Sequence, residues 1–292
     1  MTRAEHVNKP SRKKIVRLTI RHVVLALFAA FWLIPILWLV LNAFSVDKGP
    51  NLSRFFPEAF TLDHFRNILL PGGDAVNQFP RWFMNTLIVG CFNCVISSAF
   101  VLMVAYAMSC MRFKARKPMM NVAIILNLFP GFLSMIAVYF ILKQFGLTNS
   151  LVGLVVVYSA GSGMGYLIAK GFFDTISKSL REAAWIEGAN EFTVFWKIIL
   201  PLAKPIIVYT VINAFLAPWM DFVMAFLMLN SGVSAQKTVA LGLFAMVDKV
   251  NRNNYCGEFC AGGVIVSIPI SILFVIMQKF YVEGITGGSV KG

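Results

Sequence analysis

The sequence predicts an all-α membrane protein with six transmembrane helices and a helix-turn-helix segment on the cytoplasmic side between the fourth and fifth helices. The chain has 292 residues, of which 58% are hydrophobic and only 13% charged, whereas soluble domains average about 25% charged residues. Its apolar runs are long enough to cross about 30 Å of hydrocarbon. None of the runs alternates with the period of two that a barrel strand requires. Backbone in lipid must satisfy its hydrogen bonds internally, so we expect helices.

Six runs meet this length criterion. The expected spans, in chain order, are 23–44, 83–108, 119–142, 151–172, 206–229 and 261–282. The first run follows a basic segment, but it is longer than the apolar region of a signal peptide and no small-residue cleavage site follows it. We therefore expect a basic N-terminal segment (1–22), a transmembrane domain (23–283) and a C-terminal tail (284–292).

The positive charges predict the orientation of these spans. Most of the 26 Lys and Arg residues lie before the first span, after the second, after the fourth and at the C-terminus. Positive charge accumulates on the cytoplasmic side of membrane proteins, so both termini and the segment 177–201 should be cytoplasmic. The net charge of +13 is spread between spans rather than gathered on one soluble module, which argues against a nucleic-acid partner.

The segment 177–201 contains REAAWIEGANEFTVFWKIILP, a charged and amphipathic stretch between two apolar runs. Ser179 and Glu182 fit a capping box, in which the hydroxyl and the carboxylate each accept a backbone N–H. We therefore expect a first helix over about residues 180–187. Gly188 suits the left-handed residue that ends such a helix.

A second helix should follow the glycine. Asn190 is a good N-cap, and Pro201 should end the helix because proline lacks a backbone N–H. One apolar stripe is expected at helical spacing, formed by Phe192, Phe195, Trp196 and Ile199. Two interpretations remain open on physical grounds: a hairpin that anchors a loop at the membrane surface, or a rigid knob that docks a soluble partner.

The spacing Glu182-Ala183-Ala184, Gly188, Ile198-x-Leu200-Pro201 resembles the EAA motif of ATP-binding-cassette importer permeases, E-A-A-x3-G-x9-I-x-L-P. In that family the motif forms a coupling helix that fits a cleft on the ATPase subunit. The resemblance implies ATPase contacts by Glu182, Ala183, Ala184, Gly188, Ala189, Ile198, Leu200 and Pro201.

Further stretches resemble carbohydrate permeases of the maltose and maltodextrin type, in particular the smaller six-span subunit. They are 129–150, PWMDF at 218–222 and the Gly-rich tail 284–292, although Ile285 departs from the leucine usual in that tail. The resemblance implies an importer of oligosaccharide, such as maltodextrin, that works by alternating access in the bacterial cell membrane. A second ATPase contact in the tail would involve Gly287, Gly288, Lys291 and Gly292.

The same resemblance implies a set of partners: a second, larger permease, a cytoplasmic ATPase dimer and an extracytoplasmic solute-binding protein. The chain contains no G-x-x-x-x-G-K-[ST], the sequence with which a P-loop holds phosphates. ATP and Mg should therefore bind the partner ATPase, and we expect no cofactor on this chain. The family places the sugar mainly on the larger permease, so no sugar ligand is assigned here.

We expect no catalytic residues and no metal site. No predicted span offers a Ser–His pair or a set of His and carboxylate ligands. Cys256 and Cys260 lie four residues apart, which is poor helical geometry for a disulfide, and whether they pair is left open.

Asp221 is the only acidic residue within a predicted span. With Trp219 it is a candidate for a gate or pathway position. A lone carboxylate also suits a proton-coupled secondary transporter, which is the alternative function, and a membrane scaffold without transport activity is a third.

Overall fold

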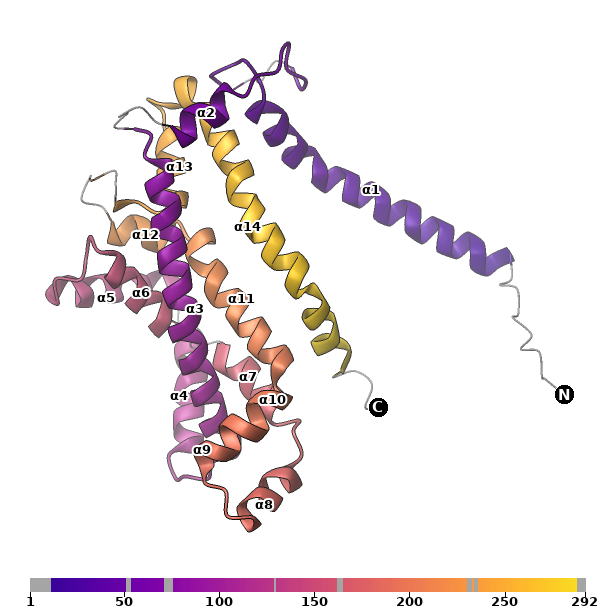
Figure 1. The fold of residues 1–292 in the computed structure, drawn as a ribbon, viewed down its shortest axis with the longest axis vertical. Helices are drawn as coiled ribbons and strands as arrows, with labels where there is room; N and C mark the ends of the chain where they lie inside the picture. Colours follow the sequence, from indigo (N-terminus) through magenta and orange to yellow (C-terminus); the bar gives the residue numbers. More distant parts are fainter. Residues whose placement is uncertain are drawn as a thin grey trace.

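The structure is a computed structural model that describes residues 12–50, 54–70, 76–128, 130–161, 165–229, 233 and 236–287, and every regular element in those ranges is a helix (Figure 1). The elements are α1 (Arg12–Ala43), α2 (Asp63–Leu69), α3 (Phe79–Cys110), α4 (Arg116–Leu128), α5 (Gly131–Gln144), α6 (Leu151–Ala160), α7 (Gly165–Phe173), α8 (Lys178–Ile186), α9 (Glu191–Thr193), the π-helical turn η2 (Val194–Ile199), α10 (Leu200–Leu202), α11 (Lys204–Met220), α12 (Val223–Met228), α13 (Val239–Met246) and α14 (Arg252–Gly287).

Three of these helices, α1, α3 and α14, are each long and apolar enough to cross a membrane. Three further pairs meet the criterion together but are bent: α4 with α5 by 104°, α6 with α7 by 42°, and Glu191–Leu202 with α11 by 86°. By length and composition the chain therefore has three to six spans, within the described residues. The prediction of an all-helical membrane protein is confirmed.

Three of the expected spans are not single straight helices. The run 151–172 is divided between α6 and α7, which are bent by 42°. The run 119–142 is divided between α4 and α5, with Pro130 just before α5, because proline removes a helical hydrogen bond and clashes with the preceding turn. The run 206–229 is divided where α11 ends at Met220 and α12 begins at Val223. Apolarity alone does not reveal any of these divisions, since both parts of each run are hydrophobic.

The first and last long helices extend beyond the expected boundaries. Helix α1 begins at Arg12, inside the segment expected to precede the first span, and α14 begins at Arg252 rather than near residue 261. Lys, Arg and Glu are good helix formers, so a helix can continue past the apolar stretch that marks it in sequence. Helix α14 also continues to Gly287, into the expected tail.

Helix α3 is central to the packing. It lies along α11 and contacts α6 and α7, while α14 packs against α1, α2, α11 and α13 (Figure 1). Helix α1 leans away from the other helices, and within the described chain none of its most apolar stretch is buried. That stretch is therefore available to lipid or to another subunit.

Two apolar clusters fix the two ends of the bundle. One joins α1, α2, α3, α13 and α14, with Trp82, Phe79, Ile68, Met246 and Ala261 among its buried members. The other lies at the opposite end and joins α3 and α7 to the segment around α8 and η2, with Ala105, Phe173, Ala184, Val194 and Ile199 among its members. The charged segment singled out in the sequence is thus packed onto the bundle.

Candidate functional site: the 178–202 hairpin and an interhelical cavity

The charged segment folds as two short helical arms joined by a tight turn, here called the 178–202 hairpin. It consists of α8, followed by α9, η2 and α10, and it lies beyond the ends of α3 and α7 at one extremity of the molecule (Figure 1). The helix-turn-helix expected between the fourth and fifth spans is present.

The turn has the geometry that the sequence predicts. Gly188 has a φ of 86°, a left-handed conformation that glycine adopts without a Cβ clash. The N–H of Ala189 donates to the carbonyl of Ala184 at 2.9 Å and closes α8. The side chain of Asn190 then accepts the N–H of Thr193 at 2.8 Å and begins the second arm.

The expected capping box is not formed. Helix α8 begins at Lys178, one residue before Ser179, and the hydroxyls of Ser177 and Ser179 lie 2.7 Å apart and share a hydrogen bond. Because Ser177 occupies the N-cap position, Ser179 falls inside the first turn and cannot reach the N–H that a cap would bind. Glu182 is exposed.

The second arm buries a different face from the expected stripe. The π-helical turn η2 buries Val194, Phe195 and Ile199, whereas Phe192 and Trp196 are 72% and 60% exposed with parallel rings 6.3 Å apart. A π-helical turn has i→i+5 hydrogen bonds and therefore rotates the following side chains relative to an α-helix. Two residues of the predicted apolar stripe, Phe195 and Ile199, are buried, and the other two are exposed.

Pro201 does not end the arm. It lies within α10, and the bend to α11 falls at Ala203, the residue between the two helices. The φ of proline is already helical and its ring is tolerated in the first turn of a helix, which is where the structure places it.

Arg181 attaches the hairpin to the end of α3. Its Nη1 donates to the carbonyl of Cys110 at 2.9 Å, and its side chain is 8% exposed. The last carbonyls of a helix lack intrahelical partners and carry partial negative charge, so the guanidinium satisfies one of them. The hydroxyl of Tyr106 also donates to the carboxylate of Glu191 and ties the second arm to α3.

The residues expected to contact an ATPase fall into two groups. Those that are exposed and available to a partner are Glu182, Ala183, Gly188 and Pro201. Ala184 is buried, and the partly buried residues Ala189, Ile198 and Leu200 pack against the apolar cluster below the hairpin. Sequence reasoning missed Arg181, and also Ile186, whose side chain is 88% exposed beside the turn.

Of the tail residues expected to contact the ATPase, the structure describes only the first. Gly287 is the last residue of α14. Gly288, Lys291 and Gly292 lie outside the described residues.

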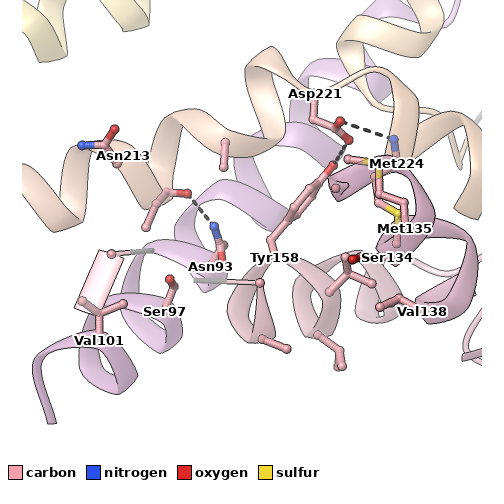
Figure 2. Close-up of a pocket in the computed structure, with 18 of the residues that line it drawn as sticks. Asn93, Ser97, Val101, Ser134, Met135, Val138, Tyr158, Asn213, Asp221 and Met224 are labelled. Atoms are coloured by element: carbon pink, nitrogen blue, oxygen red, sulfur yellow. Dashed lines mark hydrogen bonds between the residues drawn. The ribbon is translucent and has the colours of Figure 1, made fainter. Parts of the chain in front are cut away.

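A cavity of about 830 Å³ lies between α3, α5, α6, α7, α11 and α12 (Figure 2). Its wall is mostly apolar, with Asn93, Ser97 and Ser134 among the polar side chains that line it. The Nδ2 of Asn93 donates to the carbonyl of Ala214 on α11 at 2.6 Å and holds α3 to that helix. The volume falls in the range of about 300–1,000 Å³ that is typical of small-molecule sites.

Asp221 lies on the cavity wall and caps α12. Its carboxylate accepts the N–H groups of Met224 and Ala225 at 3.3 and 3.0 Å, and the hydroxyl of Tyr158 at 2.7 Å (Figure 2). Trp219 is 5% exposed and packs against Phe83 rather than lining the cavity. Of the two residues proposed from the sequence for a gate, Trp219 and Asp221, only Asp221 lines the cavity.

At the opposite end from the hairpin, His64 of α2 lies against Glu258 of α14. Nδ1 of His64 is 3.3 Å from Oε1 of Glu258, and Nε2 is 3.1 Å from the carbonyl oxygen of Asp47. The hydrogen bond to Glu258 raises the pKa of His64 against the opposing effect of burial. Two acceptors face this ring, so only the doubly protonated imidazolium donates to both. No local sequence pattern predicts this contact, which joins residues far apart in the chain.

Among the described residues no group of three His, Cys, Asp or Glu side chains gathers to hold a metal. Cys256 and Cys260 are both free.

The geometry is that of a helical membrane subunit with a hairpin packed at one end, and comparison with known proteins identifies its class. Residues 102–287 match the family described as the binding-protein-dependent transport system inner membrane component. The chain belongs to this family, and it is the multi-pass inner-membrane permease component of an ATP-binding-cassette importer, not its ATPase. A system of this kind implies a separate ATPase, a second permease and a binding protein.

The relatives it resembles are similar over nearly their whole length. The galactooligosaccharides transport system permease protein GanQ of Bacillus subtilis is 32% identical, with 96% of this chain and 98% of that protein covered. The maltose/maltodextrin transport system permease protein MalG of Escherichia coli is also 32% identical, with 97% and 99% covered. The crystal structure of a bacterial ATP-binding-cassette transporter that imports the acidic polysaccharide alginate contains a chain with a similar fold, with a TM-score of 0.78. The superposition covers 94% of this chain and 100% of that one, and the two are 23% identical in sequence.

Proposed function

We propose that this chain is the smaller permease of an importer for neutral oligosaccharides, and that the 178–202 hairpin is the element through which ATP drives transport. Support for the substrate class comes from relatives named for galactooligosaccharides and for maltose or maltodextrin. In this proposal the six spans are α1, α3, α4 with α5, α6 with α7, α11 with α12, and α14, and both termini and the hairpin lie in the cytoplasm.

The mechanism is alternating access. Two cytoplasmic ATPase subunits close around ATP, the hairpin moves with them, and the spans open outward to accept sugar from a solute-binding protein. Hydrolysis and release of phosphate restore the inward-facing state. The ATPase binds ATP and Mg, and this chain contributes the membrane helices that rearrange around the sugar.

The attachment of the hairpin is the observation that carries this proposal. Ala184 and Arg181 are buried against the ends of α3 and α7, while Glu182 and Ala183, adjacent in sequence, are exposed. One face of α8 is therefore fixed to the bundle and the other is free to meet a partner. A segment that only rested on lipid headgroups would not need a buried arginine that binds a helix end.

A bulky substitution on the free face tests the proposal. Ala183→Trp should lower ATP-driven oligosaccharide uptake at least tenfold in proteoliposomes that hold the full complex, while ATP hydrolysis continues. Ala115→Trp is the matched control, because Ala115 is also exposed in a connection next to the end of α3 but lies outside the hairpin. Normal uptake by the Ala183→Trp complex would contradict the coupling role.

A further inference from the structure

Three helix breaks meet at the cavity. Gly131 follows the break between α4 and α5, and Gly161 and Gly165 flank the break between α6 and α7. Asp221 lies between the end of α11 and the start of α12. All four of these residues line the same cavity.

The convergence has a physical reason. Non-helical backbone at membrane depth is stable only where it is buried in protein or lines a polar cavity, because lipid cannot bind the freed N–H and C=O groups. Discontinuous helices that meet within the membrane commonly form solute sites in transporters. Three breaks around one space therefore place backbone that lipid cannot satisfy next to a cavity that can hold water or a polar solute.

The side chains in this wall offer hydrogen bonds that the protein itself does not use. Ser97 is 4% exposed, lines the cavity, and its hydroxyl makes no hydrogen bond within the described part of the chain. Asn213 donates to the carbonyl of Tyr209 in its own helix at 2.8 Å, and its Oδ1 accepts no bond from any described residue. Ser134 on α5 adds a second hydroxyl group to the wall, beside the amide of Asn213.

The charge of the wall selects the class of solute. Asp221 is the only charged side chain among the described residues that line the cavity. Its carboxylate is already held by Tyr158 and by the N-terminus of α12. With no lysine, arginine or histidine in this wall, a solute that carries carboxylates would be repelled, whereas hydroxyl groups can donate to the amide oxygen of Asn213 and accept from Ser97.

We propose that this cavity is a binding subsite for a neutral oligosaccharide on this chain itself, with Ser97, Ser134 and Asn213 as hydrogen-bonding groups and Tyr158, fixed by Asp221, as part of the wall. The inference rests on the proposed function and deepens it. It places part of the sugar path in this subunit, where the resemblance alone assigned no ligand.

A thiol reporter in the wall measures occupancy directly. Ala217 lines the cavity on α11, so Ala217→Cys is introduced into the full complex in nanodiscs, and the rate of its reaction with a hydrophilic maleimide is followed by mass spectrometry of the labelled peptide. The probes are maltotriose and the acidic trisaccharide trigalacturonate. Maltotriose should slow labelling at the reporter, and trigalacturonate should not.

A matched pair of asparagine substitutions then separates a ligand contact from general packing. Asn213 and Asn127 both donate to the carbonyl four residues earlier in their own helix, at 2.8 Å each, but only Asn213 lines the cavity. In the reporter background, Asn213→Leu should raise the maltotriose concentration needed for half protection about tenfold, the usual effect of one lost hydrogen bond, and Asn127→Leu should leave it unchanged.

Three outcomes would overturn the subsite: no protection by maltotriose, equal protection by trigalacturonate, or equal shifts from the two leucine variants. Uptake of labelled maltotriose by the wild-type complex is a separate measurement of the proposed function. If protection at the reporter is found without uptake, the subsite stands and the transport assignment fails; uptake without protection removes the subsite alone.

Discussion

Arg181 of α8 donates a hydrogen bond from Nη1 to the carbonyl of Cys110, the last residue of α3, at 2.9 Å. The contact joins the hairpin to a helix that runs through the whole bundle and also packs against α6, α7 and α11. A displacement of α8 would therefore be carried directly into the helices that surround the cavity.

Replacement of Arg181 should loosen the hairpin. In Arg181→Met the carbonyl of Cys110 loses a charged donor, and such hydrogen bonds contribute about 1.5–3 kcal/mol. We expect faster hydrogen exchange across residues 178–202 and reduced coupling of ATP hydrolysis to uptake. Lys178→Met is the control, since Lys178 lies exposed in the same helix. Identical exchange in the two variants would show that the Arg181 contact does not hold the hairpin.

Substitutions of Gly188 should be limited by the backbone conformation at this position rather than by the room available for a side chain. Its φ is 86°, and a Cβ built there meets no atom within 4 Å. Gly188→Asn should be nearly neutral because asparagine tolerates the left-handed region, whereas Gly188→Val should cost about 1–2 kcal/mol or more. Thermal unfolding of the purified complex, with uptake measured in parallel, tests the order. Equal effects of asparagine and valine would mean that the turn is not left-handed in the complex.

Asp221 should act as a helix cap and not as a proton carrier. Asparagine is also a good N-cap, so Asp221→Asn should keep uptake close to wild type, while Asp221→Leu should destabilise the α12 region by about 0.5–2 kcal/mol. The measurement is oligosaccharide uptake by both variants under two conditions, one with ATP present and one with a proton gradient alone. Uptake that is driven by the gradient alone and abolished by Asp221→Asn would instead favour a proton-coupled carrier.

The packing of α2 against α14 should depend on pH through His64. The pKa of His64 is raised above its ordinary value of 6.5 in the folded chain. Its contribution to stability is therefore fully present below about pH 6.5 and is lost as the pH rises through the raised pKa. Hydrogen-exchange protection of residues 54–70, corrected for intrinsic rates, should fall as the pH rises above about 6.5.

The matched variant for that experiment is His64→Gln, which keeps one donor for the carbonyl of Asp47 but does not titrate. Its protection should show no step over the same interval. A step of equal size in His64→Gln would assign the pH dependence to another group.

The sequence allowed prediction of features that depend on local chemistry. Gly188 and Asn190 were identified because a left-handed turn and an N-cap each favour particular residue types. The spacing of Glu182 to Pro201 located the hairpin and its family. Long apolar runs located the membrane helices, since hydrophobic length is a local property.

Features that depend on tertiary contacts were not predictable in the same way. The register of η2 follows from packing Val194 and Ile199 on α3 and α7, which turned Phe192 and Trp196 outward. The pairing of His64 with Glu258 joins two elements distant in sequence. The cavity requires three helix breaks to meet, and only the folded chain brings them together.

Site-specific photocrosslinking from the free face of α8 tests the central claim most directly. A photoreactive residue at position 183 is introduced into the assembled transporter, and its adducts are identified by mass spectrometry with and without ATP. The main adduct should be the ATPase subunit, and its yield should change between the two conditions. Adducts with lipid alone, in both conditions, would contradict it.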